Sequence, residues 1–453
     1  MIAPRVSCTM FVVLVGLVCR AGAQVVQGPP GGSSGLFGSG SGTVAAPQLS
    51  VTFDQDGGYE DNRITETTAE GDSLVPIQSG YVATGAATLS YRVGRPERSL
   101  VGVGSGSVSQ QQVGGGLPSY RLIRGSGQLR GTTNIGRRSR LNMMAESSYE
   151  PAFLFGTFDT LGRNVSTGQT GSSTGLEAPA SFRPSLTSQR WLASQVGGDT
   201  SYSWTPRQRT SIGYSVSWLR PLSGVGFESR ARTTALEHAW RPTGNTAFEL
   251  SYRNLSNPQR LDDGFEQRLG VQTAEGRLRY ERRLSPRRSL AFMAGGGAAR
   301  VDASGPLGQS DIQLTSPTVS ASVRLGVVSS WGMSLTTRRD VTVLFGLSPE
   351  PFSSNAVLVS LDGTARRRLT FDITGGYSQG RTLVGARGAF DQTMIDAMLR
   401  YGFGTRVGVT VLYSYNNHEF QNVSVVPSSF PTNFGRNSVR VGLTFWLPLY
   451  GRF

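Results

Sequence analysis

The sequence contains no lysine, and all 44 of its basic residues are arginine. Only two cysteines and two histidines occur among its 453 residues. Both cysteines, Cys8 and Cys19, lie near the N-terminus, so the remainder of the chain has no thiolate for a disulfide framework or a metal site. His238 and His418 are too few for a histidine-rich metal site. We therefore expect no bound metal and no cofactor.

Long apolar runs are also missing from the body of the chain. No central run reaches the roughly 18 residues needed for a transmembrane helix. The hydrophobic content of 38% suits either a soluble protein or a β-barrel, in which only every second residue faces lipid. By length alone the chain could hold two or three soluble domains, but a single repeating pattern runs through it and does not support that division.

The N-terminus has the features of a processing segment. Arg5 provides a positive charge, Met10–Val18 is a short apolar run, and Ala21–Ala23 has the small-x-small cleavage pattern. These features predict that residues 1–23 are a signal peptide. The alternatives are an uncleaved helical anchor, for which the apolar run is too short, and a lipoprotein acylated at Cys19, which the preceding residues fit poorly.

Two regions follow the predicted signal peptide. Residues 24–47 are rich in Gly, Ser and Pro, which predicts a flexible periplasmic segment too short and too polar to form a plug domain. Residues 48–453 are predicted to form an all-β transmembrane antiparallel β-barrel. Removal of Arg5 and Arg20 lowers the formal charge from +14 to +12. High basicity can indicate nucleic-acid binding, but a secreted chain without a nucleic-acid motif argues against such a partner.

Strands are predicted from a two-residue period. In the last strand the odd positions from Val439 to Leu449 are apolar, while Ser438, Arg440 and Thr444 alternate with them. Because successive side chains of a strand point to opposite faces, one face is continuously apolar and the other is polar. The same alternation recurs along the chain.

Eight short turns separate pairs of strands. They are Arg95–Arg98, Gly136–Ser139, Thr205–Arg209, Arg241–Asn245, Leu284–Arg288, Ser329–Gly332, Ala365–Arg368 and Gly402–Arg406. Sixteen strands joined by these turns, a first strand near Gln48–Asp54 and a last strand at Asn437–Leu447 give eighteen strands. Totals of sixteen or twenty strands stay open, because apolar and polar residues alternate imperfectly in Gln189–Trp204 and Gly226–Trp240.

Three further features indicate a membrane. Predicted strands of 10 to 15 residues match the span of a tilted transmembrane strand. Aromatic residues occur near strand ends, as an interfacial girdle requires. These residues are Tyr91, Trp204, Trp218, Trp240, Tyr280, Tyr401 and Trp446. The C-terminal residues Phe445, Leu447, Leu449 and Phe453 are similar to an outer-membrane assembly signal. The expected location is the cell outer membrane, with its lipid and the barrel assembly machinery as partners.

The polar face of the strands carries charged residues that we predict to line the lumen. They are Glu249, Arg253, Glu275, Arg277, Arg279, Glu281, Arg324, Asp372, Asp396, Arg400 and Arg440. Two hypotheses stay open: the charges pair across strands and only solvate the wall, or they form a selectivity ring for an anionic solute.

Arginines also collect at the predicted periplasmic turns. They are Arg137, Arg138, Arg140, Arg207, Arg209, Arg282, Arg283, Arg287, Arg288, Arg366, Arg367 and Arg368. They form either a solubilising rim or a docking ring for an acidic periplasmic partner.

No catalytic set is evident. His418 lies near a predicted outer strand end, but the adjacent Glu419 points to the opposite face. Gly295–Gly297 lies within a strand and not before a helix, so it is not a phosphate-binding loop; glycine there permits bending or close approach. We therefore expect no enzymatic activity.

The segment Gly58–Asn62, with the sequence GYEDN, resembles the opening segment of β-barrel porin families. Some members of these families occur in exopolysaccharide operons. The resemblance implies a passive conduit and transfers no catalytic residue.

Two functions are expected from the sequence. The first is an outer-membrane channel for solutes or for export of a polysaccharide, in which case a periplasmic polysaccharide-export partner would be present. The alternative is a structural or adhesive scaffold that presents extracellular loops such as Pro151–Gln189.

Overall fold

The computed structural model describes residues 48–63, 78–95, 98–113, 120–151, 190–221, 228–260, 266–285, 288–304, 312–328, 330–343, 351–366, 368–383, 388–421 and 433–450. The predicted signal peptide, the segment 24–47, most of the loop Pro151–Gln189 and Phe453 lie outside these ranges.

Eighteen β-strands make up the described chain. They are β1 (Gln48–Arg63), β2 (Gln78–Arg95), β3 (Arg98–Val113), β4 (Tyr120–Ile135), β5 (Ser139–Pro151), β6 (Arg190–Thr205), β7 (Gln208–Pro221), β8 (Glu228–Trp240), β9 (Thr246–Arg260), β10 (Glu266–Ser285), β11 (Arg288–Ser304), β12 (Ile312–Val328), β13 (Trp331–Val343), β14 (Pro351–Arg366), β15 (Leu369–Thr382), β16 (Ala389–Gly402), β17 (Val407–Gln421) and β18 (Asn433–Tyr450).

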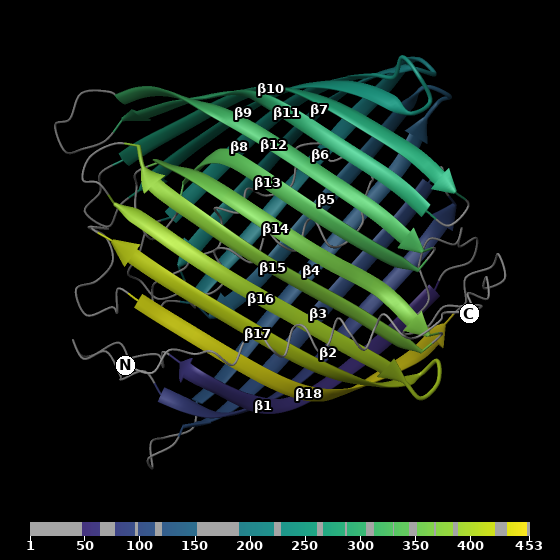
Figure 1. Ribbon diagram of the computed structural model, residues 1–453, viewed down its shortest axis with the longest axis vertical. Helices are drawn as coiled ribbons and strands as arrows, with labels where there is room; N and C mark the ends of the chain where they lie inside the picture. The colour runs from purple at the N-terminus through teal and green to yellow at the C-terminus, as the bar shows by residue number, and fades with distance from the viewer. Residues whose placement is uncertain are drawn as a thin grey trace.

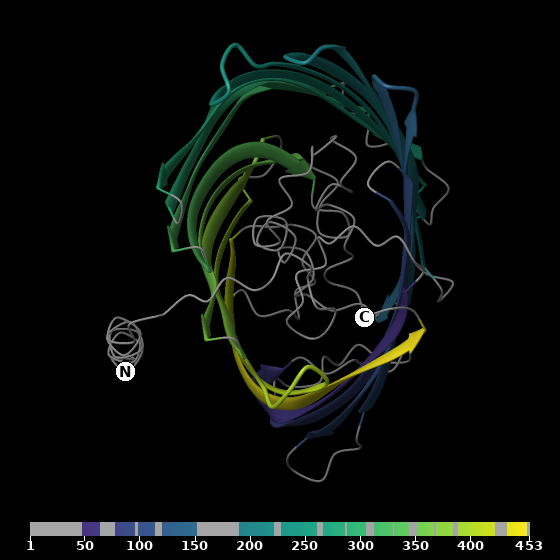
Figure 2. The same ribbon diagram turned by 90° about the vertical axis from the view of Figure 1, so that its right-hand side faces the viewer.

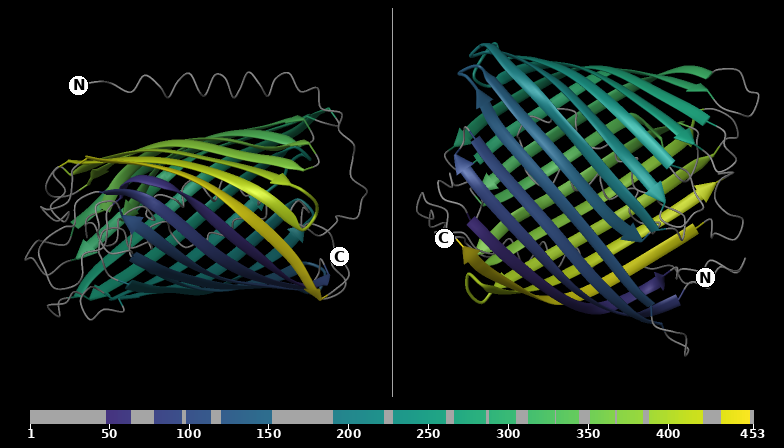
Figure 3. Two further views of the ribbon diagram at one scale, coloured as in Figure 1. Left: turned by 90° about the horizontal axis from the view of Figure 1, so that it is seen from below. Right: turned by 180° about the vertical axis from the view of Figure 1, so that it is seen from behind.

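The strands form one antiparallel sheet that closes on itself. Each strand pairs with its neighbours in sequence, and β1 pairs with both β2 and β18. Figure 1 shows the strands running obliquely across the wall, and Figure 2 shows the oval outline of the closed barrel. The view from below in Figure 3 shows yellow β18 beside purple β1. The predicted fold class and the count of eighteen strands are confirmed.

All eight predicted short turns coincide with connections between paired strands. The two terminal strands are longer than predicted. β1 continues past Asp54 to Arg63, and β18 starts at Asn433 and not at Asn437. The reason is pairing: Tyr59 and Glu60 of β1 lie opposite residues of β18, so the ladder extends toward the end of the barrel with the long connections.

The outward face is apolar. On β18 the side chains of Val439, Val441 and Leu443 are 48%, 53% and 44% exposed, whereas Ser438 and Thr444 are 7% and 3% exposed. The alternate residues point into the concave side of the barrel, where neighbouring side chains crowd them. A closed sheet with an apolar exterior satisfies its backbone hydrogen bonds internally, as a membrane requires. This architecture agrees with the outer-membrane location expected from the sequence.

Among the residues that the structure describes, no helix has the length and apolar character needed to cross a membrane.

Aromatic side chains meet on the outer face near the short turns. Trp240 stacks on Phe248 with a centroid distance of 5.7 Å, and Tyr401 meets Phe403 at 5.4 Å. These contacts fit the predicted interfacial girdle. The prediction that Trp446 belongs to this girdle is wrong. Trp446 lies in the same alternating series as Thr444 and therefore faces the interior.

His238 lies on the outer face and not in the lumen. Its Nδ1 is 3.0 Å from the hydroxyl of Thr210, which also accepts a hydrogen bond from Trp204 Nε1 at 2.9 Å. The histidine is therefore an interfacial residue of the girdle.

A small apolar cluster lies inside the barrel and joins β8–β11 to the end of β13. Its buried members are Ala231, Leu255, Leu269, Val271, Ala299, Val301 and Val341. Because β11 and β13 are not adjacent strands, this packing draws the end of β13 toward the opposing part of the wall.

Candidate pore lining

All eleven charged residues predicted to face the lumen lie on the inward-facing series of their strands. The neighbouring residues of each strand carry the exposed apolar side chains, such as Leu250 and Leu278. The inward residues are Glu249, Arg253, Glu275, Arg277, Arg279, Glu281, Arg324, Asp372, Asp396, Arg400 and Arg440. Their role in selectivity stays a prediction.

On β9 and β10 the charges are arranged in ion pairs. Arg277 donates to Glu275 at 2.5 Å, and Glu249 lies directly across the strand pair from Arg277. Nearer the short turn, Arg279 lies 3.3 Å from Glu281. Four of the five charged side chains named here are therefore joined in two ion pairs, and Glu249 lies beside one of them.

The glycine run of β11 makes room for this cluster. A Cβ added at Gly295 would lie 2.5 Å from Cγ of Arg277, and one at Gly297 would lie 1.9 Å from the carbonyl oxygen of Ala274. The run allows close approach between β10 and β11, as expected from its position inside a strand.

Arg253 of β9 faces charges from across the barrel. Its electrostatic neighbours are Arg338 and Asp340 of β13 together with Arg277 and Glu275 of β10. Since three strands separate β9 from β13 in the sheet, this proximity shows that the wall is folded toward itself here. The same region holds the apolar cluster that contains Val341. Together these observations place the end of β13 near β9 and β10 and bring at least two guanidinium groups, those of Arg253 and Arg338, into the same region of the inner wall.

A third group lies on β12, β14, β15 and β16 and is richer in carboxylates. Arg324 approaches Asp362 at 3.9 Å, and Asp362 lies directly opposite Asp372. Asp396 and Arg400 lie further along the sheet, on β16. The two opposed carboxylates give this part of the wall a local negative character.

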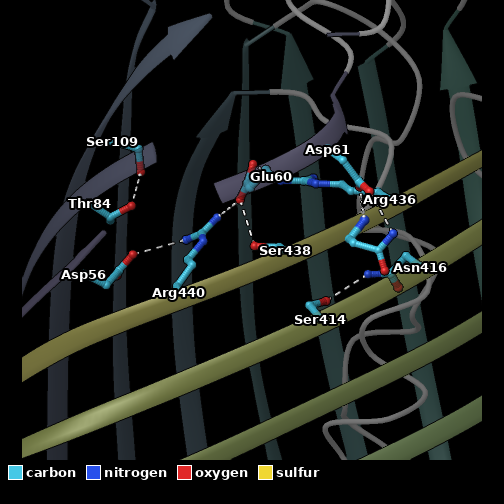
Figure 4. Close-up of polar contacts among 11 residues, drawn as sticks. Asp56, Glu60, Asp61, Thr84, Ser109, Ser414, Asn416, Arg436, Ser438 and Arg440 are labelled. Carbon is cyan, nitrogen blue, oxygen red and sulfur yellow. Dashed lines mark hydrogen bonds and ion pairs between the residues drawn. The ribbon is translucent and has the colours of Figure 1, made fainter. Parts of the chain in front are cut away.

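The strongest cluster joins the first and last strands (Figure 4). Glu60 is fully buried and accepts hydrogen bonds from Arg436, at 2.5 Å, and from Arg440. Ser438 donates to the same carboxylate at 3.3 Å. Arg440 also lies 3.6 Å from Asp56. We refer to Asp56, Glu60, Arg436, Ser438 and Arg440 as the seam cluster.

Two further hydrogen bonds cross the same strand pair. Thr444 donates to Asp54 at 2.6 Å, and Asn437 donates through its side chain to Asp61 at 2.8 Å. The β1–β18 closure thus has polar contacts along much of its length.

Gly58 lies at a close approach between β1 and β18. A Cβ added there would lie 2.0 Å from the carbonyl oxygen of Val439 and 2.8 Å from Cγ of Arg440. The neighbouring Tyr59 points outward and meets Tyr81 edge to face at 5.7 Å. The segment that resembles the opening of β-barrel porin families therefore serves, in this chain, to close the barrel. The side chain of Asn62 lies outside the described residues.

Several inward charges were missed by the sequence reasoning. Asp56 and Glu60 were omitted because the first strand was ended at Asp54. Arg338 and Asp340 were omitted because the alternation of inward and outward residues was not traced along β13. In both strands the even-numbered residues continue the inward series, so the two-residue period could have identified all four.

The remaining predicted features give no reaction site. His418 lies in β17 opposite Gln392, but its side chain falls outside the described residues. Within the described ranges no group of three or more His, Cys, Asp or Glu side chains is placed to hold a metal ion. Phe445, Leu447 and Leu449 lie on the outer face of β18, and their role in assembly stays a prediction.

No protein-family model matches the chain, and no curated protein matches it. Solved structures that it resembles include OccK2 (OpdF) of Pseudomonas aeruginosa in complex with glucuronate, at 13% identity and a TM-score of 0.46, covering 90% of this chain and 100% of that chain. OpdQ of the same organism is 12% identical with a TM-score of 0.42, covering 89% and 98%. OccAB4 of Acinetobacter baumannii is 12% identical with a TM-score of 0.41, covering 93% and 100%. At these identities the likeness concerns the fold alone. The resemblance to barrels of exopolysaccharide operons stays a prediction.

Proposed function

We propose that this protein is an outer-membrane channel through which small hydrophilic solutes diffuse passively. The observation that carries the proposal is the closed barrel of eighteen strands with a polar inward face. Barrels of about eight strands are filled by their own side chains, whereas barrels of 16 to 18 strands leave an aqueous lumen.

The inward face supports passage of polar solutes. Hydroxyl groups form cross-strand pairs, such as Ser105 with Ser126 and Ser334 with Ser360, both at 2.6 Å. Charges of both signs lie between them, so the wall offers hydrogen bonds without a continuous field of one sign. Such a surface suits neutral, hydroxyl-rich solutes. A more specific form of this proposal is that the channel exports a polysaccharide. Export would also require a periplasmic partner protein.

Planar-bilayer recording of the purified protein tests the proposal. We expect stable, single-step conductances that persist without any energy source. Replacing Arg253 by Gln should shift the ion selectivity toward cations by about twofold. That is the effect of one unit charge about 10 Å from the ion path in water, or about 0.4 kcal/mol. Arg381→Gln, which alters an exposed arginine of the outward-facing series, is the matched control and should leave the selectivity unchanged.

Silence in the bilayer from protein that is correctly folded would contradict the proposal. That result would instead favour the structural or adhesive scaffold, in which the barrel only presents its extracellular loops.

A further inference from the structure

Exposed arginines surround the end of the barrel where the short turns lie. We define the arginine rim as Arg138, Arg207, Arg241, Arg282, Arg368 and Arg406. They belong to six different strand-to-strand connections or the strand ends beside them. The rim therefore extends around much of the barrel mouth and is not confined to one loop.

The backbone holds several of these arginines in fixed positions. The carbonyl oxygens of Arg138, Arg207 and Arg368 each accept a hydrogen bond of 2.8 Å from the backbone of the next hairpin, and that of Arg406 accepts one of 2.7 Å from Trp446 of β18. Each turn is thus tied to its neighbour. Turns linked in this way hold the backbone of these arginines around a ring before any ligand binds, so binding needs to order only the side chains.

The rim arginines keep their charges unpaired within the part of the chain that the structure describes. Within the described ranges no ion pair joins a rim arginine to a carboxylate. Arg368 donates to the carbonyl oxygen of Phe403 at 3.3 Å, which leaves its positive charge uncompensated. The inward wall, in contrast, pairs many of its arginines with carboxylates.

Aromatic side chains on the outer face lie directly beside the rim. Trp240 precedes Arg241, and Phe403 lies in the same turn as Arg406. Both aromatic residues are exposed, at 45% and 60%. Tryptophan and other aromatic side chains at barrel ends lie at the level of lipid headgroups. Arginines one to three residues beyond them are placed where lipid phosphates lie, and a guanidinium group binds phosphate with two parallel hydrogen bonds.

We propose that the arginine rim is a binding surface for anionic phospholipid headgroups of the leaflet on the short-turn side. The rim anchors that end of the barrel at the membrane interface through phosphate contacts. The proposal requires the barrel to span a membrane, but it does not depend on whether the lumen conducts.

Native mass spectrometry of the purified full chain tests the proposal. The protein is offered phosphatidylglycerol and phosphatidylcholine with matched acyl chains. Each arginine near an anionic surface strengthens binding severalfold, and salt screens part of that gain. We expect the protein to bind phosphatidylglycerol roughly tenfold more tightly than phosphatidylcholine at moderate ionic strength.

A fourfold variant isolates the rim. Arg138→Gln, Arg207→Gln, Arg368→Gln and Arg406→Gln together should reduce the preference to about twofold or less. The matched control changes four exposed arginines at the opposite strand ends: Arg220→Gln, Arg232→Gln, Arg339→Gln and Arg381→Gln. The control should keep the preference. Replacing the same rim positions by Lys should preserve most of it, since the charge is retained.

Two results would overturn the proposal. One is equal binding of both lipids by the unaltered protein, a measurement that needs no variant to fold. The other is an equal loss of preference in the rim and control variants. If soluble polyaspartate binds the unaltered protein while phosphatidylglycerol shows no preference, the rim recognises an acidic soluble partner and the lipid proposal is wrong.

Discussion

Glu60 shows how one side chain can hold two distant parts of the chain together. It is fully buried, and its carboxylate accepts hydrogen bonds from two arginines that lie more than 370 positions later. A buried charge of this kind is tolerated only when it is paired and fully hydrogen-bonded. Removal of its charge would leave Arg436 and Arg440 with less compensation at the closing seam.

We predict that Glu60→Gln destabilises the barrel by about 3 kcal/mol or more, the range measured when one partner of a buried ion pair is removed. Urea-induced unfolding in lipid vesicles, followed by tryptophan fluorescence, measures this change.

Glu146→Gln is the matched control. Glu146 is exposed and accepts one hydrogen bond from Gln128 at 3.1 Å. Its replacement should change the free energy of unfolding by less than about 0.5 kcal/mol. Equal effects of the two substitutions would mean that the seam cluster does not stabilise the closure.

At the scale of the strands, the closure between β1 and β18 depends on backbone approach as well as on charge. At Gly58 β1 lies so close to β18 that an added Cβ would be 2.0 Å from the carbonyl oxygen of Val439. We predict that Gly58→Ala lowers the yield of folded barrel, because the two strands must separate locally or shift in register. The fraction that keeps the faster mobility of a folded barrel on unheated gels measures this yield.

Gly85→Ala provides the comparison. Gly85 lies on the neighbouring strand β2, and a Cβ added there meets no atom within 4 Å. This variant should fold as well as the unaltered protein. If both glycine variants fold equally well, the close approach at Gly58 is not a requirement for closure.

Much of the fold could be predicted from short-range patterns. The turns gave the strand number, since each hairpin requires a local turn, and the two-residue period placed eleven charged residues on the inward face. The electrostatic proximity of Arg253 to Arg338 could not be predicted in this way. It depends on how the wall curves in three dimensions, and alternation within a strand carries no information about curvature.

Across the whole molecule, positive charge is distributed unevenly. The sequence has a formal charge of +14. In the structure many inward arginines lie beside carboxylates, whereas the exposed arginines of the rim at the short-turn end form no ion pair with any residue that the structure describes. Net charge alone therefore says little about the field inside the lumen, and the position of each arginine decides its effect.

The central claim is that the first strand closes the barrel against the last. A cysteine pair at Gly57 and Val441, which lie opposite each other on the outer face, tests it most directly in protein with Cys8 and Cys19 replaced by Ser. We predict rapid disulfide formation in the membrane-inserted protein, detected as altered gel mobility that reductant reverses. The control pair, Gly57 with Val411 of β17, lies one strand further away and should not cross-link. Failure of the first pair to cross-link, or equal cross-linking of both pairs, would contradict the closed barrel.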